Sequence, residues 1–154
     1  TTQLQTQDSI SVLVNNSGPY IGTAIPHDYG FDGSGIIISV IDTGVDFNHP
    51  DLLGLGLEGK IIGGYDFIDN DETPQDSNGH GTQVAGIIAA NGNLTGIAPN
   101  SKILAYRVSE DGESVSSNLI IKAIEKSISD NADIINISLG INQTNTKIDQ
   151  IVTK

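Results

Sequence analysis

The sequence predicts an α/β fold in which a mostly parallel sheet carries helices on both faces. Three observations lead to this prediction. Continuous runs of β-branched residues are typical of strands covered on both sides, segments with helical periodicity lie between those runs, and small residues on the first helix allow close packing on a sheet. Because strands and helices alternate along the chain, right-handed crossovers should join the strands.

The expected elements follow one another without a visible internal repeat. They are a strand over 36–41, a short strand over 60–62 leading to a turn at 63–64 and a second strand edge at Tyr65, a helix from His80 that Asn93 and Gly96 stop, a strand over 101–108, a helix over 116–129, a strand over 132–138 and a helix from Thr144 onward. The inward faces should comprise Val84, Ile87 and Ile88 in the first helix, and Leu119, Ile120, Ala123, Ile124 and Ile128 in the second.

The chain is expected to divide into two unequal parts. Residues 1–30 are polar and rich in turn signals, which predicts a loop-rich N-terminal lead-in, and residues 31–154 carry the alternating pattern of one domain. A length of 154 residues is enough to bury a reasonable core.

Composition excludes several classes of function. The net charge of −12 argues against nucleic acid and against anionic membrane surfaces as partners. No window approaches the roughly 18 uninterrupted apolar residues of a membrane span. The chain has no cysteine, which excludes disulfides and thiol chemistry. The first residues, TTQLQTQDSI, lack the layout of a signal peptide.

The strand over 36–41 runs directly into a carboxylate, Asp42. A buried ionised carboxylate needs a partner, and ligands of open parallel sheets bind beyond the carboxyl ends of the strands. His80 begins a helix that returns toward the same edge. An aspartate that accepts the Nδ1 proton of a histidine is the orienting pair of a nucleophilic hydrolase, so Asp42 and His80 are the candidate catalytic residues.

Several motifs resemble, in order and spacing, the subtilisin-like serine proteases. They are VIDTGVD, HPDL, NGHGTQVAGIIAA, GIAPNSKILAYRV and DIINISLG, which together cover about residues 30–140. The resemblance implies that Asp42 is the triad aspartate and His80 the general base. It also implies that Ser138, Leu139 and Gly140 pair with an extended peptide substrate and wall its S1 pocket, with Gly112 and its neighbours as the other wall of the cleft.

The resemblance also defines what these residues lack. The family needs a serine nucleophile in a Gly-Thr-Ser box and an asparagine oxyanion donor, and neither motif occurs here. We therefore expect the N-terminal part of a catalytic domain that is inactive alone. Its expected partners are an extended polypeptide substrate and the missing C-terminal half, with self-association through an open strand edge as a further expectation. A secreted or cell-surface location is expected, with any signal peptide outside this chain.

The loop YDFIDNDETPQDSNGHGT is the candidate metal site. Its closely spaced oxygens suit calcium, which takes about six to eight oxygen ligands in flexible geometry. It is similar to the calcium loop of the thermitase-like subtilases, which implies a structural calcium held by Asp66, Asp69, Asp71, Thr73 and Gln75. The alternative is an Asp-rich solvated turn without metal. The segment ANGNLTGIAP lacks the longer loop that carries a second calcium site in many subtilisins, so Asp51 is expected to be an ordinary surface residue.

Two other functions compete with proteolysis. The first is a non-catalytic pseudoprotease half-domain that binds a peptide or calcium without hydrolysis. The second is a nucleotide-binding α/β domain, which the sequence disfavours because no Gly-rich phosphate loop opens the helix at His80.

Overall fold

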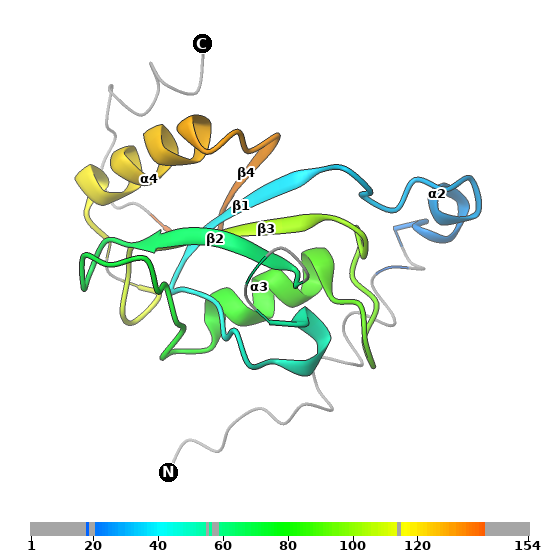
Figure 1. Cartoon of the computed structure of the whole chain (residues 1–154), viewed down its shortest axis with the longest axis horizontal. Helices are drawn as coiled ribbons and strands as arrows, with labels where there is room; N and C mark the ends of the chain where they lie inside the picture. Colours follow the sequence, from blue (N-terminus) through cyan, green and yellow to red (C-terminus); the bar gives the residue numbers. More distant parts are fainter. Residues whose placement is uncertain (1–17, 19–20, 55, 57–58, 114, 141–154) are drawn as a thin grey trace.

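A computed structural model describes residues 18, 21–54, 56, 59–113 and 115–140. Four strands form one sheet in the order β2-β3-β1-β4, and every neighbouring pair is parallel. Their bounds are β1 Ile37–Asp42, β2 Ile61–Asp66, β3 Lys102–Arg107 and β4 Ile134–Ile137. Figure 1 shows the sheet as a twisted band crossing the molecule.

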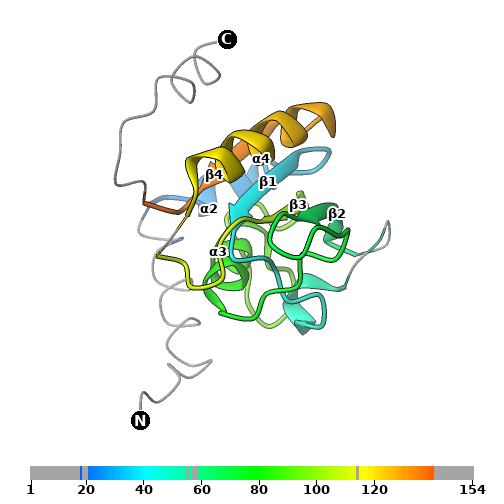
Figure 2. The same cartoon turned by 90° about the vertical axis from the view of Figure 1, so that its left-hand side faces the viewer.

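Helices cover the two faces of this sheet. Helix α3 (His80–Ala89) lies under one face and α4 (Ser117–Ser129) lies over the other, as Figures 1 and 2 agree. A short helix α2 (Ala24–Asp28) lies at one end of the sheet, and a 3-10 turn η1 (Pro50–Leu52) packs near α3. The predicted fold class, a parallel sheet between helices, is confirmed. None of the helices in the described ranges is long and apolar enough to span a bilayer.

Alternate strand residues build two cores, one on each face. The α3 side buries Ile38 and Val40 of β1 with Ile103 and Ala105 of β3, against Ala85 and Ala89 of the helix. The α4 side buries Ile41 with Leu104 and Tyr106, against Ile120, Ala123 and Ile124. Because side chains alternate along a strand, the residues that end β1 and β3, Asp42 and Arg107, point to the α3 side.

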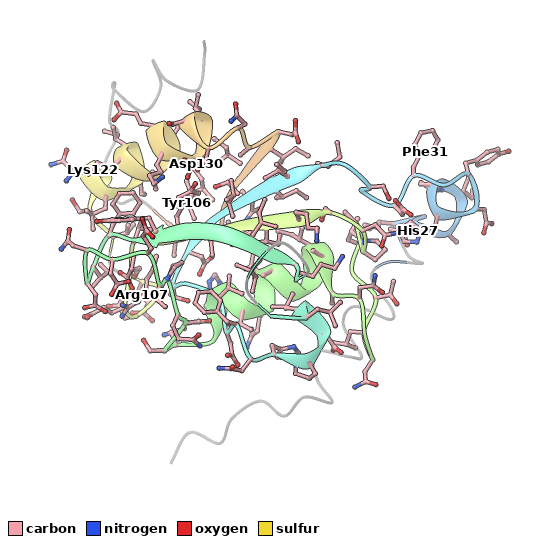
Figure 3. All side chains as sticks on the ribbon, in the orientation of Figure 1. His27, Phe31, Tyr106, Arg107, Lys122 and Asp130 are labelled. Atoms are coloured by element: carbon pink, nitrogen blue, oxygen red, sulfur yellow. The ribbon has the colours of Figure 1, made fainter. Side chains whose placement is uncertain are left out.

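Three strands finish on charged residues in one row of the sheet. Asp66 of β2 pairs in register with Arg107 of β3, and Arg107 with Asp42 of β1. Figure 3 shows Arg107 at this end of the molecule, with His27 and Phe31 at the opposite end near α2. Strand β1 lies between β3 and β4, so later strands of the chain lie on both sides of it. The carboxyl end of such a strand is where α/β sheets bind ligands.

Three local predictions are corrected. The pair Gly63-Gly64 is not a turn, because β2 continues through it with a register shift. Ile128 is 58% exposed rather than inward, and Ser127 is buried in that part of α4. Ile87 on α3 is also exposed. The helix predicted from Thr144 lies outside the described residues.

Candidate active site

The predicted catalytic pair is in direct contact. His80 Nδ1 lies 2.7 Å from Asp42 Oδ1. Asp42 is fully buried at the end of β1, whereas the side chain of His80 is 42% exposed at the start of α3. A carboxylate can only accept a hydrogen bond, so the proton of this bond belongs to Nδ1, and Nε2 of the neutral ring is left as a proton acceptor. This geometry is the one that a general base requires.

The carboxylate of Asp42 is held rigidly on one oxygen. Oδ1 also accepts a hydrogen bond from the backbone N–H of Thr43, at 2.7 Å. Oδ2 has no hydrogen-bond partner among the described residues. A buried anion with one unbonded oxygen depends strongly on the partners of the other oxygen, which here are the N–H of Thr43 and the imidazole of His80.

Two glycines permit close backbone approach at the Asp42 segment: Gly81 lets the His80 segment approach it, and Gly44 lets residues 74–76 approach it. A Cβ on Gly81 would lie 2.1 Å from the carbonyl oxygen of Gly44 and 3.1 Å from Asp42 Oδ1. A Cβ on Gly44, whose φ is +100°, would lie 2.6 Å from the carbonyl oxygen of Pro74. Gly44 and Gly81, which follow Asp42 and His80 in the sequence, are therefore glycines for a steric reason. At each of them another stretch of backbone lies too close to leave room for a side chain.

The turn after β3 borders the pair. Gly112 adopts φ +75°, and a Cβ built on it would lie 3.8 Å from His80 Cβ and 3.5 Å from Thr43 Cγ2. Asn78, two residues before His80, donates a side-chain hydrogen bond to the carbonyl oxygen of Asp111 at 3.1 Å. The structure thus brings Gly112 next to His80.

The segment 138–140 leaves the sheet on the other side of β1. Ile137 pairs in register with Ile41, so Ser138 follows at the edge where Asp42 ends β1. Ser138 and Gly140 are exposed, and a Cβ on Gly140 would meet nothing within 4 Å. Leu139 packs against the core on the α4 side.

A cation from the end of β3 contacts the acidic loop. Arg107 Nη1 contacts Asp66 Oδ2 at 2.8 Å and Asp69 Oδ2 at 2.7 Å. Asp66 Oδ1 accepts the backbone N–H groups of Ile68 and Asp69. The hydrogen bond to Asp66 raises the pKa of Arg107, against the opposing effect of burial. Two of the five predicted calcium ligands therefore share a guanidinium.

The other predicted calcium ligands have local partners. Asp71 Oδ1 accepts the backbone N–H of Thr73 at 2.7 Å. The amide of Gln75 accepts from the backbone N–H of Phe47 and donates to Asp46. In the part of the chain that the structure describes, no three acidic or histidine side chains are gathered as a metal-binding group. The oxygen types suit calcium, but the three aspartates of the set do not gather as a group of three among the described residues.

Asp51 is a correction to the sequence-based expectation. It is 3% exposed, and its Oδ1 accepts the backbone N–H of Asn93 at 2.7 Å. A Cβ on Gly92 would lie 2.2 Å from the same oxygen. Asp51 therefore caps the short turn after α3 instead of lying on the surface. Gly92, directly before Asn93, was the sequence signal that could have indicated the close approach of Asp51 to this turn.

The fold and this pair of side chains define an α/β domain in which a buried aspartate contacts a partly exposed histidine at the carboxyl end of the sheet. The Subtilase family profile matches residues 33–154, and the chain belongs to that family. It is 42% identical over 146 residues to the minor extracellular protease Vpr of Bacillus subtilis (strain 168). The matched region covers 87% of this chain and 17% of that protein. It is 45% identical over 125 residues to thermitase of Thermoactinomyces vulgaris, covering 79% of this chain and 43% of thermitase.

A solved structure shows the same relationship. The crystal structure of a cold adapted subtilisin-like serine proteinase matches with a TM-score of 0.67 at 38% identity, covering 80% of this chain and 43% of that one. The chain thus spans less than half the length of these three relatives.

Proposed function

We propose that this chain supplies the aspartate and the histidine of a subtilisin-type serine endopeptidase, with Asp42 and His80 in those roles. The observation that carries the proposal is the 2.7 Å contact between His80 Nδ1 and the buried carboxylate of Asp42, on a ring whose side chain is still 42% exposed. Membership of the subtilase family supports the same assignment. A core histidine with a purely structural role would have no need of that exposure.

The proposed chemistry is peptide-bond hydrolysis through an acyl-enzyme. Nε2 of His80 takes the proton of a serine hydroxyl as that oxygen attacks the substrate carbonyl, and Asp42 stabilises the imidazolium that forms. The ring then gives its proton to the leaving amine. No Gly-Thr-Ser box and no oxyanion asparagine occur within these 154 residues, so the 154-residue polypeptide by itself should not form the acyl-enzyme.

The proposed substrate is an extended polypeptide. Gly112 borders His80 on the β3 side of β1, and Ser138–Gly140 leaves the sheet on the β4 side, so the two segments flank the end of the central strand. Exposed backbone at Ser138 and Gly140 can accept a peptide strand by main-chain hydrogen bonds. These roles of the two segments rest on their placement and on the family.

A serine-directed fluorophosphonate probe tests the enzyme assignment. The chain is joined to a subtilase segment that carries the serine box, and labelling is compared with the His80→Ala variant and with the serine-to-alanine variant. Labelling of the parent that both substitutions abolish supports the triad. A folded parent that is not labelled would favour a non-catalytic peptide-binding domain instead.

Calcium is proposed for the acidic loop as a structural ion. The oxygen donors of Asp71, Thr73 and Gln75 support it, and Asp66 and Asp69 would each contribute an oxygen while Arg107 keeps part of their charge balanced. Calorimetric titration with calcium should give binding heat and a rise in Tm, and Asp71→Asn should remove both. No heat and no shift in the parent chain would eliminate the site.

A secreted or cell-surface location and pairing through the edge strand β4 complete the proposal. The relative Vpr is described as extracellular. In the described sheet β4 has one neighbour, β1, so its other edge can pair with a strand of the missing half or of another copy. Sedimentation of the chain over a concentration series tests self-association, and a monomer throughout would exclude it.

A further inference from the structure

Asp76 lies outside the contact between Asp42 and His80, yet its carboxylate is the most heavily bonded group near it. Oδ1 accepts from Thr43 Oγ1 at 3.0 Å and from the backbone N–H groups of Asn78 and Gly79, both at 2.9 Å. Oδ2 accepts from the backbone N–H of Thr82 at 2.9 Å and from its hydroxyl at 2.5 Å. One side chain thus connects the residue after Asp42, the turn before His80 and the first turn of α3.

These bonds complete the capping of the helix that carries His80. The N-cap residue Gly79 has no side chain to offer. The first three amides of α3 are instead capped from outside the helix: His80 N by Asn78 Oδ1, Gly81 N by Thr43 Oγ1, and Thr82 N by Asp76 Oδ2. A carboxylate at this position is also favoured by the positive end of the helix dipole.

Thr43 links the two halves of the pair. Its backbone N–H donates to Asp42 Oδ1, and its hydroxyl accepts from Gly81 N at 2.9 Å while donating to Asp76. A hydroxyl has a single proton. Because Asp76 takes that proton, a lone pair of the oxygen faces Gly81. The carboxylate of Asp76 therefore orients the Thr43 hydroxyl so that its oxygen accepts the N–H of Gly81, the residue after His80.

We propose that Asp76 is a positioning residue of the proposed proteolytic site, fixing the Asp42 and His80 segments in the geometry that keeps the imidazole on the carboxylate. The inference rests on the proposed function. The carboxylate of Asp76 bonds Thr43, the turn before His80 and Thr82 instead of the imidazole, so it acts through Thr43 and the N-terminus of α3. A displacement of about 1 Å at such a site costs on the order of 100-fold in rate.

The first test is made on the 154-residue chain and needs no activity. With ¹⁵N-labelled histidine, the hydrogen-bonded Nδ1 proton of His80 is followed by NMR in the parent chain and in Asp76→Asn, which keeps the size of the side chain but presents an N–H₂ group toward one set of donors. The matched control is Asp51→Asn, another aspartate that caps a backbone turn. We expect the Nδ1 resonance to broaden or disappear in Asp76→Asn and to persist in Asp51→Asn.

The outcomes separate positioning from ordinary capping. An unchanged Nδ1 resonance in a folded Asp76→Asn chain would overturn the proposal and leave Asp76 as a cap. Loss of the resonance in both variants would overturn it as well, because general loosening would then explain the effect. If Asp76→Asn does not fold, Thr43→Val removes the same hydroxyl link and Thr43→Ser restores it. Loss of the Nδ1 resonance in Thr43→Val with its recovery in Thr43→Ser supports the proposal. The same spectrum in both variants overturns it.

The second test uses the chain joined to the subtilase segment that carries the serine box, which we call the serine-completed protease. Asp76→Asn should lower kcat by about 10-fold to 100-fold with a smaller change in KM, since the hydrogen bonds of the Asp76 carboxylate go to Thr43, Asn78, Gly79 and Thr82 and not to the substrate-flanking segments themselves. A rise in KM by the same factor with kcat unchanged would contradict a positioning role. A parent that fails to react with the probe counts against the proposed function, whereas the NMR comparison still decides whether Asp76 holds the pair.

Discussion

The two strands that flank β3, β1 and β2, both end on buried aspartates, and these aspartates have different kinds of partner. Asp42 ends β1 and contacts a titratable imidazole that is 42% exposed, and Asp66 ends β2 and contacts a guanidinium that is 8% exposed. Both carboxylates are shielded almost completely, and both occupy the same row of the sheet, with Arg107 between them in register.

The difference lies in what each partner can do. A guanidinium stays charged at every physiological pH, so the Asp66–Arg107 pair can stabilise the fold and anchor the acidic loop but cannot transfer protons. An imidazole changes charge near neutrality, so the Asp42–His80 pair can accept and return a proton. The proposed function thus assigns one structural and one catalytic aspartate to the same sheet edge. They differ in the kind and the exposure of their partner, and not in their own burial.

The largest expected effect is at Asp42. In the serine-completed protease, Asp42→Asn should lower kcat by about 10⁴ because an amide at this position favours the wrong tautomer of His80. Steady-state kinetics measures this, with Asp66→Asn as the control that should keep kcat per folded molecule. Equal kinetic losses at both positions would remove the distinction between the two aspartates.

Asp66 should dominate stability instead. Removing one partner of a buried ion pair leaves an uncompensated charge, so Asp66→Asn should lower the free energy of unfolding by about 3 kcal/mol. Urea denaturation of the 154-residue chain measures it. The matched control is Asp69→Asn, whose carboxylate contacts the same guanidinium but is 65% exposed and should cost less than about 1 kcal/mol. Equal costs would show that burial does not govern the pair.

The close approach at Gly81 gives a smaller effect on both properties. Gly81→Ala places a methyl group against the Gly44 carbonyl, so α3 must shift; we expect a loss of about 2 kcal/mol in stability and a fall in kcat. Gly86→Ala in the same helix meets nothing within 4 Å and should stabilise by about 0.5 kcal/mol. A Gly81 variant that is as stable and active as Gly86→Ala would contradict the steric argument.

The smallest effect concerns the opposite face of the sheet. Tyr106 is buried beneath α4 and donates to Asp130 at 2.6 Å (Figure 3). Burial, followed by the contact with Asp130, raises its pKa above the ordinary value. The unfolded chain then loses this proton first, so stability is complete below about pH 10 and falls as pH rises beyond it. Tyr106→Phe should flatten that alkaline fall in urea titrations. A slope identical to the parent would refute the assignment.

Sequence patterns predicted most elements because buried parallel strands are continuous β-branched runs. The prediction for β1 was 36–41 and the strand is Ile37–Asp42; for β3 it was 101–108 and the strand is Lys102–Arg107. The misreading at Gly63-Gly64 has a physical cause. A Cβ on Gly64 would lie 1.7 Å from the carbonyl oxygen of Ala105, so this glycine serves close strand approach, which looks like a turn signal in the sequence.

The candidate site was predictable only as far as its motifs. Asp42 and His80 were predicted from a strand end and a helix start, and the structure places them in contact, while their catalytic role stays a prediction. The contacts of Arg107 and Asp76 were not predicted, because they join residues 41 and 33 positions apart whose meeting depends on strand register and loop path. The calcium ligands were predicted from oxygen-bearing residue types and from the resemblance to a subtilase calcium loop, and neither shows whether the side chains converge in this chain.

The tautomer of His80 tests the central claim most directly. Long-range ¹H–¹⁵N NMR of the histidine-labelled chain at neutral pH distinguishes a ring protonated on Nδ1 from one protonated on Nε2. The contact with Asp42 predicts the Nδ1–H form in the parent and its loss in Asp42→Asn. An Nε2–H ring in the parent, or the same spectrum in both proteins, would contradict the account.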